Sequence, residues 1–333
     1  MLRNSLLYDE GAREQVTQER GGMERVRRVL VSVCRDRAAP QSVHFLQSVT
    51  GHFGTTDQVN VSCSLDRNRL IVLKDDTDRG IPLKCLFDHQ RAPFCPIKHL
   101  SVKEAASISL DIQQRGVDVG VAIILQTADK RVLLTRRAKQ LRIFPNVWVP
   151  PGGHLEPDET LLEAGLRELK EETGLALEAE QFPSPKVLGV WESVYPPMLS
   201  RGPPQRHHLV VYLLLRSPCT HLQLQDCLRP SPTEVSACLW ADSRLVSAMV
   251  SAVDGQDGEI DVKRLPAVVR VSEVCPAGGL RDTTLSPGVF VNRAPYSGPD
   301  VERVSTGTKF ALGLWLKTTA EMTSEPHTCQ PNK

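Results

Sequence analysis

Hydrophobic residues along this chain gather in short blocks of strand length, separated by turns rich in polar residues, glycine and proline. The clearest block, Val117 to Leu125, is a nearly continuous apolar run, which indicates a strand. A polar turn at 127–130 and a second block at 132–135 predict the other half of a hairpin. Further blocks predict strands at 42–46, 69–73, 187–192 and 208–215.

Helical periodicity appears in three later segments. Leu162, Leu166 and Leu169 recur on one side of a predicted helix that ends before Gly174. Asp158 is expected to cap the start of this helix, and Gly174 is the residue type that most easily ends one in a left-handed conformation. A closing helix is predicted at 243–253, and a short apolar helical pattern at 305–316 could dock onto the rest of the fold.

The polar side of the first helix carries three carboxylates. Glu168, Glu171 and Glu172 are spaced i, i+3 and i+4, which places them on one helical face. The stretch from Gly153 to Leu175 contains seven acidic and two basic residues, so its local charge is −5 in a chain whose net charge is +1. Like charges at this spacing repel, so something must offset them.

A divalent cation is one way to offset the charge. Mg²⁺ takes oxygen ligands, typically one or two carboxylates together with water and substrate phosphates. A carboxylate cluster beside a glycine-rich turn is therefore a candidate site for metal-assisted attack on a polyphosphate. The alternative interpretation is an acidic helix face that is simply solvated.

The same stretch resembles a known family motif in every fixed position. Gly153, five residues, Glu159, seven residues and then Arg167-Glu168-Leu169-Lys170-Glu171-Glu172-Thr173-Gly174-Leu175 match the Nudix box. The resemblance implies an α/β fold, the Nudix α/β/α sandwich, with a smaller N-terminal accessory region and an irregular C-terminal arm. It implies a hydrolase that uses Mg²⁺ or Mn²⁺ to cleave the pyrophosphate link of a nucleoside diphosphate joined to another moiety.

The resemblance also implies roles for individual residues. Glu168, Glu171 and Glu172 would be metal ligands, one of them the base that deprotonates the attacking water, while Arg167 and Glu159 would order the loop and helix. The segment from Trp148 through Gly152 and Gly153 looks like the family's strand and entry turn beside the substrate. The segment 234–240 resembles a later strand of the same fold.

Two further features are candidates for substrate contact. Six cations lie between Lys130 and Arg142, and Arg136 and Arg137 are the best candidates among them because arginine suits bidentate phosphate contact. The alternative is an exposed basic edge. Trp191 offers a face for stacking on a base, although a tryptophan in a strand is more often packed in the core.

Composition shifts divide the chain into five parts. We expect a loose N-terminus at 1–24, a small accessory domain at 25–100, a linker at 101–115, the Nudix domain at 116–253 and a C-terminal arm at 254–333 with a docking segment near 305–317. Cys85, His89, Cys95 and His99 have a spacing that could hold Zn²⁺, or they belong to a connecting segment without a metal.

Net charge, apolar run length and cysteine content indicate where in the cell the protein is expected. Balanced charge gives no general attraction to nucleic acid or membranes, and no apolar run approaches the length of a membrane span. Nine cysteines without a Cys-x-x-Cys motif fit a reducing compartment, and the N-terminus lacks an export signal, so a cytoplasmic location is expected. Oligomeric state is left open.

The substrate is narrowed only by resemblance. Family substrates range from nucleotide sugars to dinucleoside polyphosphates and capped RNA 5′ ends. The segment 303–316, together with 116–118 and 191–193, resembles an animal branch of the family, which implies hydrolysis of 7-methylguanosine-capped RNA with release of 7-methyl-GDP. The alternatives are a coenzyme A or dinucleoside polyphosphate diphosphatase and a non-catalytic nucleotide-binding module. Coenzyme A is disfavoured because 143–148 departs from the pattern of enzymes that act on it.

Overall fold

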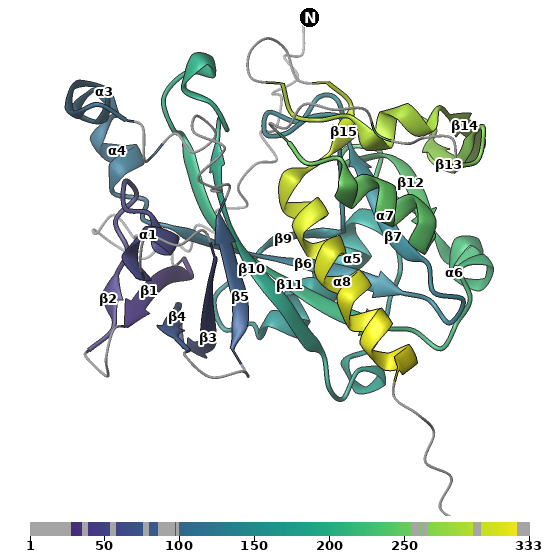
Figure 1. Cartoon of the computed structure of the whole chain (residues 1–333), viewed down its shortest axis with the longest axis horizontal. Helices are drawn as coiled ribbons and strands as arrows, with labels where there is room; N and C mark the ends of the chain where they lie inside the picture. Colours follow the sequence, from purple (N-terminus) through teal and green to yellow (C-terminus); the bar gives the residue numbers. More distant parts are fainter. Residues whose placement is uncertain are drawn as a thin grey trace, which may run out of the picture.

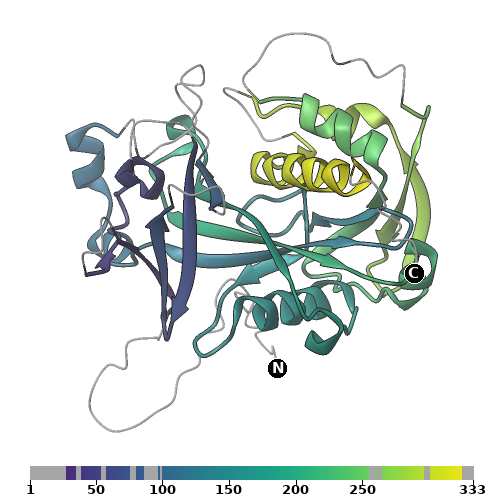
Figure 2. The same ribbon diagram turned by 60° about the horizontal axis from the view of Figure 1, so that its bottom comes forward.

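A long mixed β-sheet runs through the molecule, and helices cover both of its faces (Figures 1 and 2). The computed structural model describes residues 28–34, 39–53, 58–75, 80–85, 97, 100–254, 260, 265–295 and 301–324. The strands are β1 (Leu30–Cys34), β2 (Gln41–Ser42), β3 (Gln58–Asp66), β4 (Arg69–Lys74), β5 (Ile81–Cys85), β6 (Asp118–Gln126), β7 (Val132–Arg137), β8 (Val147–Val149), β9 (Gly152–His154), β10 (Lys186–Tyr195), β11 (Arg206–Arg216), β12 (Val235–Ala241), β13 (Val269–Val274), β14 (Leu280–Leu285) and β15 (Arg303–Val304). The α-helices are α1 (Val49–Phe53), α3 (Val102–Ser107), α4 (Leu110–Gln113), α5 (Leu161–Thr173), α6 (His221–Cys227), α7 (Ser243–Ser251) and α8 (Thr306–Ser324).

The centre of the sheet is the strand order β12-β7-β6-β11-β10, with β6 parallel to β11. Every residue of β6 is buried, which accounts for the nearly continuous apolar run in its sequence. The strands predicted at 117–125, 132–135, 187–192, 208–215 and 234–240 are confirmed.

Alternate side chains of β6 enter two different hydrophobic cores. Val121 and Ile123 belong to the core under α5, whereas Ala122 and Ile124 belong to the core under α7 and α8. Figure 2 shows α7 and α8, in green and yellow, on one side of the sheet and the teal helix α5 on the other. The α/β/α sandwich predicted from the sequence motif is confirmed.

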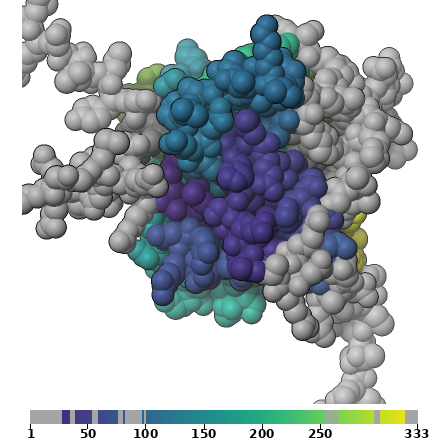
Figure 3. All heavy atoms as spheres, turned by 90° about the vertical axis from the view of Figure 1, so that its left-hand side faces the viewer, coloured from purple at the N-terminus to yellow at the C-terminus, as the bar shows by residue number. Residues whose placement is uncertain are grey.

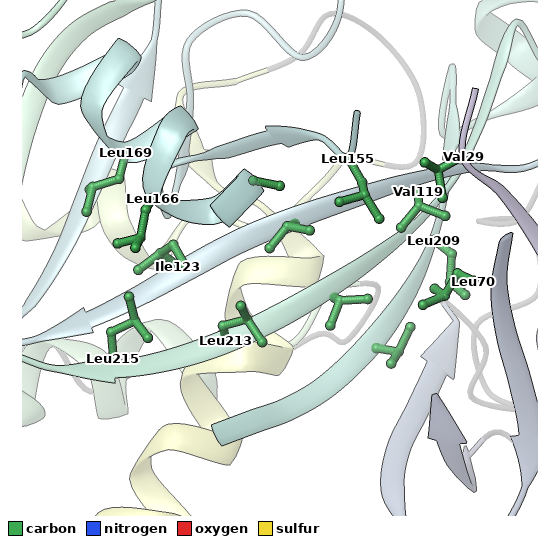
Figure 4. Close-up of a cluster of buried hydrophobic side chains, with 14 of the residues drawn as sticks. Val29, Leu70, Val119, Ile123, Leu155, Leu166, Leu169, Leu209, Leu213 and Leu215 are labelled. Atoms are coloured by element: carbon green, nitrogen blue, oxygen red, sulfur yellow. The ribbon is translucent and has the colours of Figure 1, made fainter. Parts of the chain in front are cut away.

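The N-terminal strands extend this sheet. The order continues from β10 through β5, β3 and β4 to β1, and β1 returns to β6 where Leu30 pairs with Asp118. Val29 and Leu70 pack in the same core as Val119 (Figure 4). The region expected to form a small accessory domain therefore shares its sheet and its core with the rest of the chain. Figure 3 shows the outer face of this region, with α3 and α4 beside the N-terminal strands.

A buried carboxylate fastens this region to the central strands. Glu192 in β10 accepts hydrogen bonds from the backbone N–H groups of Val49 and Thr50, at 2.7 and 2.9 Å. His207 in β11 lies 3.0 Å from the same carboxylate through Nε2, and its Nδ1 lies 2.7 Å from the carbonyl oxygen of Phe45. Burial acts to raise the pKa of Glu192, but the His207 contact and these hydrogen bonds lower it to about 2.

The C-terminal region is more regular than the sequence suggested. Residues 265–324 include β13, β14, β15 and α8, and α8 is 19 residues long, whereas the docking segment was expected near 305–317. The side chain of Trp315 in α8 donates from Nε1 to Gln126 Oε1 at 2.8 Å, and both residues are buried. The helix therefore covers the central strands, as Figure 1 shows.

The expected linker contains helices, and most of the candidate zinc residues lie outside the described part of the chain. The segment 101–115, expected as a linker, contains the short helices α3 and α4. His89, Cys95 and His99 lie outside the described residues, as does the side chain of Cys85, so the candidate zinc site stays a prediction. Within the described ranges no helix combines the length and apolarity needed to cross a membrane.

Candidate active site

Helix α5 is fixed at both ends by its own sequence. The Thr160 side chain accepts from the backbone N–H of Glu163 at 3.2 Å, and the Glu163 carboxylate accepts from the backbone N–H of Thr160 at 2.8 Å. This capping box replaces the expected cap by Asp158, which instead adopts a left-handed backbone with φ of 65°. Gly174 ends the helix with φ of 76°, as predicted.

The apolar face of α5 packs very closely on β6. A Cβ on Gly165 would lie 2.4 Å from Ile123 Cδ1, so a larger residue would force either Ile123 or the helix to move. Leu166 and Leu169 are buried in the core between the helix and the sheet (Figure 4). This packing places the polar face of α5 at a fixed position beside β9.

Arg167 connects the loop to the helix. Its Nε donates to Glu159 Oε1 at 2.7 Å, and its Nη2 donates to Glu159 Oε2 at 3.0 Å and to the carbonyl oxygen of His154 at 2.9 Å. Its Nη1 donates to Glu168 Oε1 at 2.8 Å. The hydrogen bond to Glu159 is the main cause of the raised pKa of Arg167. These contacts agree with the ordering role expected for Arg167 and Glu159.

Gly153 lies directly against the first carboxylate. A Cβ at Gly153 would lie 2.3 to 2.4 Å from the carboxylate atoms of Glu168. Gly152 is required for a different reason, because a Cβ there would lie 2.2 Å from the backbone oxygen of Val121 in β6. Gly153 therefore makes room for a functional side chain, and Gly152 makes room for strand pairing.

The three carboxylates of α5 differ in how far they are exposed to solvent. Glu172 is 6% exposed, and burial raises its pKa to about 8 against the opposing charge of Arg137. Burial also raises the pKa of Glu168, although Arg167 opposes the shift. Glu171 is the most exposed, with 41% of its side chain accessible, and its Oε2 lies 3.7 Å from Arg167. The protein alone therefore does not neutralise this acidic face.

Arg137 interacts electrostatically with the carboxylates of α5, and its contact with a substrate phosphate stays a prediction. Burial lowers its pKa, while Glu172, Glu234 and Glu168 act in the opposite direction. Its Nε donates to the carbonyl oxygen of Ile143 at 3.1 Å. Arg137 is thus held beside the acidic face of α5.

The prediction for Arg136 is not supported by its contacts. Its Nη1 lies 2.9 Å from Glu302 Oε1, its Nε donates to Ser236 Oγ at 2.8 Å, and its guanidinium lies 5.6 Å from the ring centroid of Trp148. Because successive side chains of a strand point to opposite faces, Arg136 and Arg137 are directed apart. Arg136 therefore binds the C-terminal region.

The stacking prediction for Trp191 is wrong. Its ring is 5% exposed and lies 5.4 Å, centroid to centroid, from the ring of Phe310 in α8. A Cβ on Gly307 would lie 2.8 Å from Trp191 Cδ1, so the helix covers the indole closely. Trp191 is a core residue beneath α8, which leaves no free face for a base.

Two residues of the site were not singled out from the sequence. Thr135 in β7 donates from Oγ1 to Glu172 Oε2 at 3.4 Å, and Glu234 acts electrostatically on both Glu168 and Glu172. Glu234 belongs to the acidic turn before β12, which was noticed only as a strand boundary. The backbone N–H of Ala138, just after β7, donates to the carbonyl oxygen of Glu234 at 2.8 Å. This contact joins segments that are far apart in the sequence, so the sequence alone did not place Glu234 near α5.

This geometry suits a hard divalent cation. Glu168 lies against Gly153 and interacts electrostatically with Glu171 and Glu172. Burial raises the pKa of Glu168 and Glu172, so a positive charge bound there would relieve their desolvation. The donor set consists of oxygens, which is the set that Mg²⁺ and Mn²⁺ prefer.

Comparison with known proteins agrees with the geometry. A family model described as NUDIX domain matches residues 116–253. The m7GpppN-mRNA hydrolase NUDT17 of Danio rerio is 57% identical over 299 residues, covering 89% of this chain and 97% of the relative. The Homo sapiens protein of the same name is 44% identical over 283 residues, covering 84% of this chain and 85% of the relative.

The similarity to solved structures is weaker than the similarity to these relatives. A MutT NUDIX hydrolase from Burkholderia pseudomallei is 18% identical and covers 59% of this chain and 96% of its own, with a TM-score of 0.32, too low to support any argument. The family model and the long relatives, together with a complete motif on α5, establish that this chain belongs to the Nudix hydrolase family.

Proposed function

We propose that this chain is a Mg²⁺- or Mn²⁺-dependent enzyme that hydrolyses 7-methylguanosine-capped RNA and releases 7-methyl-GDP. Four relatives named m7GpppN-mRNA hydrolase NUDT17, 44 to 57% identical, support the substrate. The observation that carries the chemistry is the position of Glu168 against Gly153 and its electrostatic interaction with Glu171 and Glu172 on the same helix. A cytoplasmic location, expected from the sequence, belongs to this proposal.

The residues of α5 have distinct roles in this reaction. Glu168 and Glu172, the more buried pair, would hold the cation together with Glu171. When bound, a divalent cation supplies electrostatic stabilisation for the negative charge that builds up on the phosphate oxygens. Glu171 is the most accessible of the three, so it is the carboxylate best placed to accept a proton from the attacking water.

Other side chains position the reacting groups. Arg167, held by Glu159, fixes the orientation of the Glu168 carboxylate. Arg137 supplies a half-buried positive charge that interacts with Glu168 and Glu172 and is suited to a phosphate oxygen of the bridge. Release of 7-methyl-GDP requires cleavage of the anhydride bridge between the phosphorus nearest the RNA and the middle phosphorus. Water adds to one of these two phosphorus atoms, the bridging oxygen leaves with the other, and the RNA keeps a 5′-monophosphate.

Product analysis tests this proposal directly. The protein is incubated with Mg²⁺ or Mn²⁺ and, separately, with capped RNA, coenzyme A, ADP-ribose and diadenosine polyphosphates, and the products are identified by mass spectrometry. We expect 7-methyl-GDP and 5′-monophosphate RNA, and the product that carries ¹⁸O from labelled water identifies the phosphorus that is attacked. Preferential cleavage of coenzyme A or a dinucleoside polyphosphate would overturn the substrate. Binding without any hydrolysis would support a non-catalytic module.

A matched variant guards against contaminating activity. Glu180→Gln removes an exposed carboxylate outside the motif and should leave the rate unchanged. Equal activity of Glu180→Gln and Glu171→Gln would show that the activity does not originate at α5.

A further inference from the structure

We propose that Asp118, His154 and His208 form a second cation site, suited to a first-row transition metal such as Zn²⁺ and separate from the carboxylates of α5. Their ligand atoms, one carboxylate oxygen and two imidazole nitrogens, all lie within 4.8 Å of one another. The three residues are far apart in the sequence and come from three strands.

The sheet register brings them together. His208 in β11 pairs with Asp118 in β6, and His154 in β9 pairs with Gly120, two residues further along β6. β6 therefore lies between the two strands that carry the histidines. The site lies at the end of β6 that also pairs with β1.

The group faces away from α5. Gly153 is directed at Glu168, so its neighbour His154 points to the opposite face of the sheet. Val119 and Leu209 belong to the core under α5, so Asp118 and His208 also point away from that core. The two sites are thus next to each other in sequence at Gly153 and His154 but open on different faces.

The distance between the imidazoles fits shared coordination. His154 Nε2 and His208 Nε2 lie 3.2 Å apart. Two ligands of a tetrahedral Zn²⁺, each at about 2.0 to 2.1 Å, are separated by about 3.3 Å. The histidine pair therefore already has the spacing of two zinc ligands. The carboxylate of Asp118 needs to move closer by at most about 1.5 Å to reach the same separation.

Two imidazole nitrogens and one carboxylate oxygen favour a transition metal over Mg²⁺. Neutral imidazole suits zinc, copper, iron and nickel, whereas Mg²⁺ prefers an all-oxygen set such as that on α5. Three protein ligands leave at least one position for water or another ligand. His154 is exposed and His208 is half-buried, so an ion can enter from solvent, while Asp118 is 4% exposed.

Without a cation the same atoms can form a different contact. One imidazole can donate an N–H to the other, and Arg28 Nη1 lies 3.5 Å from Asp118 Oδ1. Binding of a cation would displace the proton between the rings and compete with Arg28. A direct metal titration distinguishes the two arrangements.

Cobalt binding is the test. Metal-free full-length protein is titrated with Co²⁺, whose visible d–d absorption reports nitrogen coordination at low symmetry, and bound Co²⁺ is then displaced by Zn²⁺. We expect one equivalent with strong visible bands. His154→Gln changes an exposed side chain and should weaken binding on the order of a hundredfold, since loss of even an outer-shell partner costs about 10- to 100-fold.

Two control variants isolate the site. His221→Gln removes a histidine outside the proposed site whose Nδ1 contacts Asp129 Oδ2, and this variant should bind Co²⁺ as the wild type does. Glu172→Gln alters the carboxylate site and should keep the visible bands. Zn²⁺ should also raise the melting temperature of the wild type and of both controls, but not that of His154→Gln.

Two results would overturn the proposal. One is wild-type protein that shows no visible Co²⁺ bands. The other is folded His154→Gln, verified by circular dichroism, that binds Co²⁺ with wild-type affinity. Because the readout is absorption and melting temperature, it is independent of whether capped RNA is hydrolysed.

Discussion

Buried charged groups are paired within the protein at α8, on one face of the central sheet, but not fully paired at α5, on the other face. Under α8, Lys309 Nζ donates to Asp254 Oδ1 at 3.0 Å and to two backbone carbonyls, of Ala252 at 2.8 Å and Asn292 at 3.0 Å. Thr306 completes the pair by donating to the other Asp254 oxygen at 2.6 Å. Burial acts to raise the pKa of Asp254, but the charge of Lys309 and hydrogen bonds from Thr306 and the Ala294 backbone lower it below its ordinary value.

The face under α5 shows the opposite balance. Burial raises the pKa of Glu172 to about 8 and also raises that of Glu168, although Arg137 and Arg167 act against these shifts. Charge buried under α8 is neutralised within the protein, whereas charge on α5 calls for a ligand from outside. The comparison predicts that neutral substitutions on α5 reduce activity, and that substitutions beneath α8 reduce stability.

The largest effect is expected from the carboxylates of α5. Glu171→Gln removes the proposed proton acceptor and should lower turnover by about 10²- to 10⁴-fold, the range for loss of a positioned proton-transfer group, with the fold intact. Glu172→Gln removes a proposed cation ligand and should lower turnover at least about a hundredfold, because a bound cation contributes several kcal/mol. Steady-state kinetics on capped RNA and a thermal melt check both halves of this expectation. Near-normal turnover in either purified variant would refute its assigned role.

The next largest effect is expected beneath α8. Lys309→Met leaves Asp254 buried without its partner and should lower the free energy of unfolding by about 3 to 5 kcal/mol. Urea denaturation measures the change, and the folded fraction should keep its turnover. Lys317→Met, at an exposed position of the same helix, is the matched control and should change little. Equal stability of the two variants would contradict the comparison.

Two adjacent glycines give a finer test. Gly153→Ala should displace the Glu168 carboxylate and lower turnover about tenfold or more, with a small effect on stability, because a flexible side chain can move aside. Gly152→Ala collides with the backbone of β6 and should lower the melting temperature first. The reverse assignment of the two phenotypes would contradict the site geometry.

The smallest effect separates two adjacent arginines. Arg137→Gln should lower kcat/KM about tenfold because a charge-assisted phosphate contact is lost. Arg136→Gln should cost at most about 1 kcal/mol of stability through its ion pair with Glu302 and leave kcat/KM within about twofold. If Arg136→Gln were the more damaging to catalysis, the assignment of faces would be wrong.

Local patterns predicted the helix that carries the candidate site. Glu168, Glu171 and Glu172 lie on α5, and their spacing places them on one face of that helix, whereas their role as metal ligands stays a prediction. Thr160 and Glu163 also carried a readable capping signal, which competed with Asp158 and was overlooked.

Contacts between distant segments were not predictable in this way. Trp191 is covered by Phe310, which lies more than a hundred residues later in the chain, so its sequence neighbourhood gave no sign of burial. β13 and β14 form an antiparallel pair in which β14 is largely exposed, which weakens the apolar pattern used to find strands. The convergence of Asp118, His154 and His208 depends on sheet register, which single-sequence patterns do not supply.

The central claim is that the acidic face of α5 binds a divalent cation, and a Mn²⁺ titration followed by electron paramagnetic resonance tests it most directly. The wild type and Glu180→Gln should bind Mn²⁺ equally, while Glu172→Gln, with an unchanged circular dichroism spectrum, should bind at least about tenfold more weakly. Undiminished Mn²⁺ binding by Glu172→Gln would contradict the account.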